Sequence, residues 1–253
     1  MEAQTVFCRI EKKYLLTAAQ LAALWPVLSR EGLRTDQYGR HTICNIYYDT
    51  PDYALIRTSL EKPVYKEKLR LRSYGVPGPG STVFAEIKKK YRGVVYKRRE
   101  ALPLATAEAY LAGAPLPAGK HSQITREIDS FLSYWQPVPK VFLAYDRVAL
   151  FSTVDPALRV TFDANIRWRT GNVALGAGDA GAPLPLNGDY LMEVKLPDAM
   201  PLWMAHAFSA LGIYPASISK YGSCYTNCLR PREQPAILAS APQKQTTGGI
   251  FCA

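Results

Sequence analysis

The stretch "YKEKLRLRSYG" at residues 65–75 decides how this chain is expected to fold. Side chains of an extended strand alternate between two faces, so the four cations at positions 66, 68, 70 and 72 share one face. Leu69 and Leu71 lie on the opposite face, together with Glu67. Four cations in a row repel one another at close range, so this face predicts a surface that binds an anion.

The same alternation recurs in further segments, each of which places ionic and apolar side chains on opposite faces. These segments are "CRIEKKYLL" (8–16), "FAEIKKKY" (84–91), "LRVTFDANI" (158–166) and "LMEVKLP" (191–197). An open antiparallel sheet with one solvated face accounts for any one of these strands. Together, their mainly cationic faces with regularly placed carboxylates favour a closed barrel whose apolar sides point outward. We therefore predict a strand-rich α+β fold with a charged barrel interior and helices packed outside.

A charged interior of this kind predicts a polyanionic ligand accompanied by a divalent metal ion. Lysine and arginine would hold phosphate oxygens, whereas carboxylates repel phosphate and would hold the metal. The composition agrees with this reading, because the 253-residue chain has a net charge of +10 and a pI of about 9.4. Net charge alone leaves nucleic acid, an anionic membrane surface and phosphate-rich small molecules as alternatives.

A single domain is predicted over residues 1–230, followed by a disordered tail at 231–253 that is rich in Pro, Gln, Thr and Gly. Helices are expected at 17–30, 106–111, 125–135 and 198–211, the first three with threonine caps and the last closed by Gly212. Pro26 is expected to kink the first helix. The spacing predicts strands at 42–50, 64–75, 82–91, 93–104, 140–152, 158–169 and 190–197, and a flexible loop at 171–188.

The cysteines and histidines predict no metal centre. Five cysteines without a pairing framework, a secretory leader or an apolar membrane span favour reduced thiols in a cytoplasmic protein. Cys224 and Cys228 lack nearby residues that would complete a zinc site, and the three histidines are scattered. The segment "GAPLPAGKH" (113–121) differs from a phosphate-binding Walker loop in its spacing and in the His that follows its Lys.

Several motifs occur in an order that resembles a known family. They are "RIEKKY" (9–14), "YYDT" (47–50), "KEKLRLRSYG" (66–75), "AEIKKKY" (85–91), "YDR" (145–147), "LRVTFDANI" (158–166), "LMEVKLP" (191–197) and "SKYGSCY" (219–225). Together they resemble VTC-domain proteins, the polyphosphate polymerase branch of the CYTH-like triphosphate tunnel metalloenzymes. The resemblance implies an eight-stranded antiparallel tunnel in which the terminal phosphate of ATP is transferred to a growing polyphosphate chain. It also implies a requirement for Mg²⁺ or Mn²⁺.

The resemblance assigns roles residue by residue. It gives the grip on the reacting phosphates to these cations: Lys13, Arg70, Arg72, Lys88, Lys90, Arg147, Arg159 and Lys220. It implies that Tyr145 and Ser219 donate hydroxyl hydrogen bonds to the same phosphates. It also implies that Glu193 holds the metal, so that no side-chain nucleophile is required.

Further residues are assigned because they share the same ionic faces. Lys68 and Lys195 are expected to bind phosphate, and Glu11 is expected to assist at the metal. One more cation is expected from "YKRRE" (96–100), where Arg98 is preferred to Lys97 although the local alternation does not decide between them. The tyrosine and serine donors and these cations would together surround one phosphate chain.

One departure from the family pattern bears on the reaction. Hydrolytic members of the superfamily open with Glu-x-Glu-x-Lys, whereas Arg9 stands here in the first Glu position. A cation in that place weakens metal-activated attack by water and favours transfer to phosphate. We therefore expect an ATP-dependent polyphosphate polymerase. The alternatives are a hydrolase of tripolyphosphate or nucleoside triphosphates, and a non-catalytic sensor of polyphosphate.

The expected partners are ATP and inorganic polyphosphate. Nucleic acid is not expected, because "YKRRE" lacks the interleaved aromatic platform of single-strand binders. The sequence leaves open the preferred metal, the oligomeric state and whether a membrane-protein partner carries product away. Asp49 in "YYDT" is interpreted as a structural residue.

Overall fold

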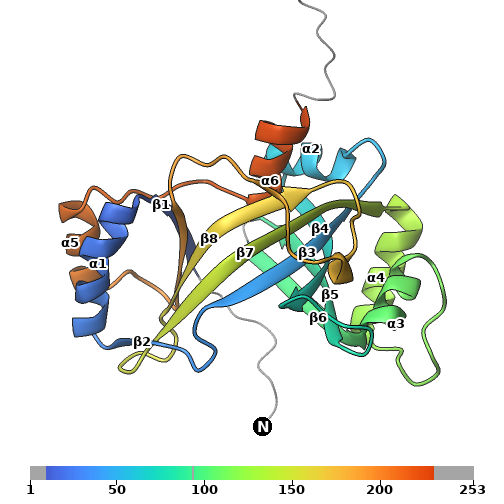
Figure 1. The fold of residues 1–253 in the computed structure, drawn as a ribbon, viewed down its shortest axis with the longest axis horizontal. Helices are drawn as coiled ribbons and strands as arrows, with labels where there is room; N and C mark the ends of the chain where they lie inside the picture. Colours follow the sequence, from blue (N-terminus) through green and yellow to red (C-terminus); the bar gives the residue numbers. More distant parts are fainter. Residues whose placement is uncertain (1–9, 93, 231–253) are drawn as a thin grey trace, which may run out of the picture.

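The computed structural model describes residues 10–92 and 94–230, and one curved antiparallel sheet dominates it (Figure 1). The main path of the sheet runs β1-β10-β8-β7-β3-β4-β5-β6, and the short strands β2 and β9 pair with β7 and β8. The strands are β1 (Ile10–Leu16), β2 (Leu33–Thr35), β3 (His41–Asp49), β4 (Tyr65–Tyr74), β5 (Thr82–Tyr91), β6 (Val94–Pro103), β7 (Val138–Ser152), β8 (Arg159–Arg169), β9 (Ala182–Pro183) and β10 (Tyr190–Leu196).

The sheet is an open half-barrel that turns through 201°, so the prediction of a closed barrel is wrong, whereas the strand-rich α+β class is confirmed. Within residues 10–92 and 94–230, the terminal strands β1 and β6 do not pair with each other. The outer edge of β1 already has another partner, because the backbone N–H of Ala216 donates to the carbonyl of Lys13 at 2.7 Å. The segment after α5 (Leu202–Ala210) therefore covers part of the edge that barrel closure would need.

The apolar side of the sheet is its convex side, and helices cover it in two places (Figure 1). α1 (Ala18–Arg30) and α5 pack against one end, where Tyr14, Phe162 and Met192 are buried. α3 (Leu104–Leu111), α4 (Gln123–Trp135) and η1 (Leu175–Ala177) pack against the other end, around Leu71 and Ile87. Burial of these apolar rows under helices fixes which side of every strand faces the concave interior.

A third apolar cluster closes one end of the concave side. α2 (Ala54–Leu60), α6 (Lys220–Cys224) and the π-helix η2 (Tyr225–Leu229) supply it, with Tyr221 stacked on Tyr47 of β3 at 4.7 Å between ring centroids. Asp49 accepts hydrogen bonds from the backbone N–H groups of Leu55 (2.9 Å) and Ile56 (3.0 Å) and from the Tyr221 hydroxyl (2.8 Å). Asp49 thus ties α2 to α6, in keeping with the structural role predicted for it.

The sequence predicted the capping residue of α1 correctly but not that of α4. Thr17 caps α1 in a capping box with Gln20, and the helix continues through Pro26 to Arg30. The cap of α4 is Ser122, whereas the sequence predicted Thr125, which instead completes the box at the third helical position. No helix within the described ranges is long and apolar enough to cross a membrane.

The segment predicted as a flexible loop at 171–188 is anchored to the sheet. It contains η1 and β9, and the guanidinium of Arg167 pairs with the Asp179 carboxylate at 2.5 Å. Arg169 donates to the carbonyls of Asn172 (3.1 Å) and Ala180 (2.6 Å). The tail predicted at 231–253 and the side chain of Arg9 lie outside the described residues.

Candidate functional site on the concave face

The first half of the concave site is built around Glu86 of β5, whose side chain is 1% exposed. The β4–β5 register places Arg70 opposite Glu86, and the Arg70 Nε and Nη2 atoms lie 2.7 and 2.5 Å from Glu86 Oε2. Lys97 Nζ approaches Glu86 Oε1 at 3.2 Å, and Arg72 Nε lies 3.9 Å from Oε2. Burial raises the pKa of the Glu86 carboxyl, but the charges of Arg70, Arg72 and Lys97 outweigh it and lower the pKa to about 2. We call these four residues the Glu86 cluster.

Polar side chains of β3 and β7 hold the two arginines of this cluster in place. Arg72 donates from Nε to Asn45 Oδ1 at 2.9 Å and from Nη2 to the Tyr145 hydroxyl at 3.1 Å. Arg70 donates from Nη1 to the Tyr47 hydroxyl at 3.2 Å. Asn45 and Tyr47 were not predicted as site residues, although polar groups two residues apart in the apolar run "TICNIYYDT" were the available signal.

The second half of the site is built around Asp163 of β8, whose side chain is fully buried. Arg147 of β7 grips both oxygens of this carboxylate, with Nε to Oδ1 at 2.6 Å and Nη2 to Oδ2 at 2.7 Å. Lys220 Nζ lies 2.5 Å from Asp163 Oδ2 and 3.5 Å from Glu193 Oε1. Burial raises the pKa of the Glu193 carboxyl, but the charges of Lys220, Lys13 and Arg147 outweigh it and hold the pKa well below its usual range. Asp163, Arg147, Lys220 and Glu193 form the Asp163 cluster.

Tyr145 joins the two clusters into one surface. Its hydroxyl accepts from Arg72, and Lys220 Nζ lies 4.4 Å from its ring centroid. Burial raises the pKa of the Tyr145 hydroxyl, but the nearby charges of Arg72, Arg147 and Lys220 lower it below its ordinary value. A phosphate chain lying against Tyr145 would therefore contact cations from both halves of the sheet.

A lysine group extends the positive surface toward β1 and β5. It comprises Lys13, Lys66, Lys68 and Lys88, and Lys68 Nζ donates to Ser219 Oγ at 3.4 Å. Burial, followed by repulsion from Lys66, Lys88 and Lys13, lowers the pKa of Lys68 to about 7. Burial likewise lowers the pKa of Lys88, although the charge of Glu11 opposes the shift. Bringing a phosphate anion among these lysines would relieve their repulsion and favour their charged forms.

The structure brings most of the predicted residues together on this face. Lys13, Lys68, Arg70, Arg72, Lys88, Tyr145, Arg147, Glu193, Ser219 and Lys220 belong to the clusters just described. Lys195 lies opposite Glu11 and Arg159 in the β1–β10–β8 register, at one end of the face. Lys90 lies two residues beyond Lys88 on β5 and is exposed.

The prediction that Arg98 rather than Lys97 faces this site is wrong. Arg98 lies opposite Ile87 on the convex side and pairs with Glu127 of α4. Lys97 lies opposite Lys88 and faces the concave side, where it reaches Glu86. The two strands β5 and β6 pair in a register that the sequence of β6 alone does not reveal.

The carboxylates Glu11 and Glu193 fit a divalent metal ion that is held partly by the protein and partly by a phosphate ligand. Both lie near Lys13 Nζ, at 3.4 and 3.6 Å. Among the residues that the structure describes, no three carboxylate, His or Cys side chains gather as a metal cage. Mg²⁺ is commonly held by one or two carboxylates together with substrate phosphates, and this donor set matches that arrangement. The residues therefore fit a metal that is shared with a phosphate ligand.

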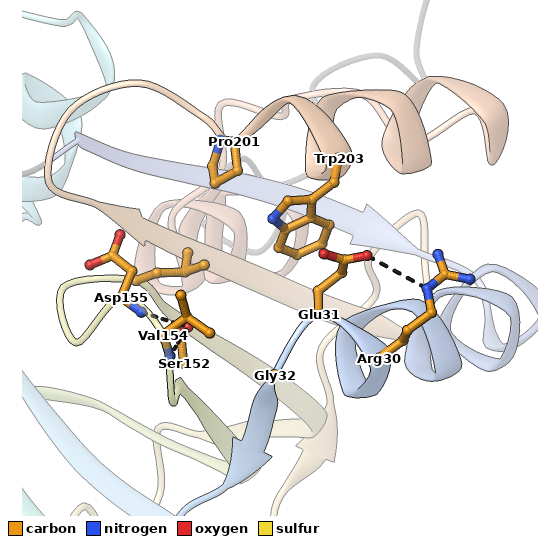
Figure 2. Close-up of a pocket in the computed structure, with 9 residues that line it drawn as sticks. Arg30, Glu31, Gly32, Ser152, Val154, Asp155, Pro201 and Trp203 are labelled. Atoms are coloured by element: carbon orange, nitrogen blue, oxygen red, sulfur yellow. Dashed lines mark hydrogen bonds and ion pairs between the residues drawn. The ribbon is translucent and has the colours of Figure 1, made fainter.

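A pocket of about 480 Å³ lies away from the concave face, between the end of α1, the β7–β8 turn and the start of α5 (Figure 2). Trp203 and Pro201 line it on one side and Asp155 on another. The Arg30 side chain points toward Glu31, with 3.5 Å between Nε and Oε1. This pocket has no convergent cations, so the concave face is the better candidate for an anion site.

Comparison with known proteins agrees with the fold and the motifs. A solved structure assigned as an adenylate cyclase of Bacillus halodurans is 14% identical, with a TM-score of 0.53, covering 85% of this chain and 96% of its own. A protein from Hippeastrum, assigned as an adenylyl cyclase with a dominant triphosphatase activity, is 15% identical with a TM-score of 0.48. That likeness covers 90% of this chain and 100% of the Hippeastrum protein. No match was found among curated proteins.

The family assignment rests on a sequence model. The model of the VTC domain matches residues 8–228, which include every strand of the sheet and α6. This match confirms the recognition of a VTC domain that was made from the ordered motifs. The chain therefore belongs to the VTC domain family.

Proposed function

We propose that this protein is an ATP-dependent polyphosphate polymerase that transfers the terminal phosphate of ATP to a polyphosphate chain on the concave face. The observation that carries the proposal is the continuous run of cations from Lys68 through Arg70 and Arg72 to Arg147. Cations outnumber carboxylates on this face, and the carboxylates Glu86 and Asp163 are buried beneath them. A long, multiply charged anion matches such a surface better than a single phosphate does.

The residues present can perform phosphoryl transfer without a protein nucleophile. The transition state is loose, so catalysis depends on in-line alignment and neutralisation of charge. Guanidinium forks such as Arg70 and Arg147 orient phosphate oxygens, and their buried carboxylate partners keep them pre-organised. Lys13 and Lys220 supply point charges beside Glu193. A divalent metal held by Glu11 and Glu193 would add Lewis-acid neutralisation of phosphate charge.

The same geometry supports hydrolysis as the second candidate, since Glu11 and Glu193 could place a metal near an attacking water. Transfer to phosphate is preferred because Arg9 replaces the first carboxylate of the hydrolytic Glu-x-Glu-x-Lys pattern. A terminal phosphate oxygen is already ionised and needs no general base, whereas water does. The terminal phosphate of a polyphosphate chain is therefore the acceptor in this reaction.

Incubation of the pure protein with ATP and Mn²⁺, resolved on a gel stained for polyphosphate, tests this proposal. We expect a ladder of growing chains with stoichiometric release of ADP. Release of ADP and free phosphate without a ladder would replace the polymerase by the hydrolase. Unchanged ATP together with tight polyphosphate binding would instead indicate a sensor.

A further inference from the structure

An aromatic group lies beyond the Glu86 cluster, at the end of the concave face away from α2. It comprises Tyr74, Phe84, His41 and the guanidinium of Arg99, and we call it the aromatic rim. The Tyr74 ring meets Phe84 edge-on at 5.7 Å and His41 at 6.1 Å between centroids. The Arg99 guanidinium carbon lies 4.7 Å from the Phe84 ring centroid. These contacts hold the rim as one unit across β3, β4, β5 and β6.

The register ties this rim to the phosphate-binding cations. Tyr74 lies two residues after Arg72 on the same face of β4, and Phe84 lies directly opposite Arg72 on β5. Two residues of a strand span about 7 Å, so the rim lies within the length of one nucleotide from the arginines. Arg99 lies opposite Glu86 on β6, and its side of the strand is therefore concave as well.

The Tyr74 ring of the aromatic rim is more exposed to solvent than its packing against neighbouring rings requires. Tyr74 is 52% exposed although it is held by two neighbouring rings. An exposed aromatic face beside a guanidinium is the surface on which nucleobases stack, because every base offers a π-face and arginine adds a cation–π contribution. The alternative is a surface cluster that only stabilises the ends of β3, β4 and β5. The position next to Arg72 distinguishes the rim from such a cluster.

We propose that the aromatic rim binds the nucleobase of a nucleoside triphosphate whose phosphates lie on Arg70 and Arg72. This inference rests on the proposed function, because it takes the phosphate chain of a nucleotide to occupy the Glu86 cluster. Stacking recognises any base, so the site discriminates little between adenine and guanine. Inorganic tripolyphosphate has no base and therefore does not use the rim.

Calorimetric titration of two ligands tests the inference: a non-hydrolysable ATP analogue and tripolyphosphate. We expect Tyr74→Ala to weaken binding of the ATP analogue by about tenfold to a hundredfold, the range typical of losing one stacked base. Binding of tripolyphosphate should stay within twofold, and Tyr74→Phe should retain the affinity for the analogue. Tyr134→Ala is the matched control, since Tyr134 lies on α4 and is 78% exposed.

The outcomes separate this inference from the function on which it rests. Equal affinities of wild-type and Tyr74→Ala protein for the ATP analogue would overturn the nucleobase site, as would an equal loss for both ligands. A GTP analogue that binds far more weakly than the ATP analogue would overturn the claim of stacking without base selection. Wild-type protein that binds neither ligand would overturn the proposed function itself.

Discussion

The two halves of the concave face neutralise their buried carboxylates in different ways. In the Asp163 cluster, Arg147 and Lys220 satisfy both oxygens of a fully buried carboxylate, at distances between 2.5 and 2.7 Å. In the Glu86 cluster, Oε2 is held by Arg70, whereas Oε1 pairs with the Lys97 ammonium at 3.2 Å and finds no partner with good hydrogen-bond geometry among the described residues. Lys97 is also the more open cation, with 43% of its side chain exposed against 8% for Lys220.

This difference determines which cations are free to turn toward a ligand. A buried carboxylate with every oxygen paired fixes the geometry of its cationic partners and leaves them little freedom to turn. The Asp163 cluster is therefore a rigid part of the binding surface, whereas the side chains of Lys97 and of the lysine group can turn toward an arriving phosphate. Substitutions that leave one half intact while changing the other separate these two roles.

The largest expected effect comes from Glu193→Gln in the Asp163 cluster. The amide keeps the volume of Glu193 and an oxygen for Lys13 and Lys220, but it removes the charge that would hold a metal. We expect metal-dependent turnover to fall below detection while the protein still folds, with a lower melting temperature because the amide no longer neutralises Lys220, Lys13 and Arg147. Mn²⁺ titrations of activity and thermal melts measure this, with Glu127→Gln on the convex side as control. Activity that persists with an unchanged Mn²⁺ requirement would remove Glu193 from the metal site.

Arg70→Ala should have the next largest effect on activity, because it removes the closest ion-pair partner of the buried Glu86. Loss of one pre-organised charge contact raises the activation free energy by about 2–4 kcal/mol. Breaking a buried ion pair also lowers the free energy of unfolding by about 3–5 kcal/mol, since Glu86 loses its closest counter-charge and keeps only the weaker pairs with Lys97 and Arg72. Rate measurements and urea titrations compare this variant with Arg126→Ala, an exposed arginine on α4. Similar rates for the two variants would mean that the concave arginines do not contact substrate.

A smaller effect is expected from Lys97→Ala, and its sequence neighbour supplies the control. Lys97 faces the concave side, so its loss should reduce phosphate affinity by about tenfold, or ~1.4 kcal/mol. Arg98→Ala removes only a partly exposed ion pair with Glu127 and should change the free energy of unfolding by about 1 kcal/mol or less. Tripolyphosphate titrations and melts distinguish the two. A stronger binding defect in Arg98→Ala would reverse the assignment of faces on β6.

The smallest expected effect is a change in pH dependence at Lys68. Burial and the neighbouring lysines lower the pKa of its ammonium to about 7, so the side chain loses its charge as the pH rises from 6 to 8. Phosphate affinity should therefore fall by a few-fold over that range. Lys68→Arg remains charged and should flatten this part of the profile. Titrations of tripolyphosphate at each pH compare the two proteins, and identical slopes would contradict the lowered pKa.

The same shift has the opposite sign for stability. The unfolded chain keeps the ordinary lysine pKa and binds the proton between pH 7 and about 10, whereas folded Lys68 does not. Raising the pH through that interval therefore increases the contribution of Lys68 to the free energy of unfolding. Urea titrations at pH 7 and pH 9 on ligand-free protein should show a larger gain for wild type than for Lys68→Arg.

The sequence predicted what depends on alternation along a single strand. In β10 a continuous apolar row marks the convex side, and in β4 the pair Leu69 and Leu71 does so, so the positions of Arg70 and Glu193 followed directly. In β6 both faces carry polar residues, and the choice between Lys97 and Arg98 depended on pairing with β5. That pairing is a contact between strands, which alternation within one strand does not encode.

Closure of the sheet and the residues beneath the arginines also depended on contacts distant in sequence. The edge of β1 is taken by Ala216, which follows it by about two hundred residues, and no local pattern announces this contact. Asn45 and Tyr47 read as parts of a buried strand until Arg72 and Arg70 are placed beside them. The buried partners of a charged surface are therefore harder to predict than the surface itself.

The placement of Lys220 on α6 has a consequence for synthesis of the protein. Every strand of the sheet is synthesised before α6, so Asp163 and Glu193 lack the Lys220 ammonium that later compensates them until this helix is made. During the translation of the residues between β10 and α6, the available partners of these two carboxylates are Arg147 and, from the lysine group, Lys13. The nascent sheet can form in this interval, but the charge of Asp163 and Glu193 is balanced only when α6 docks. Docking of α6 thus also completes the binding face.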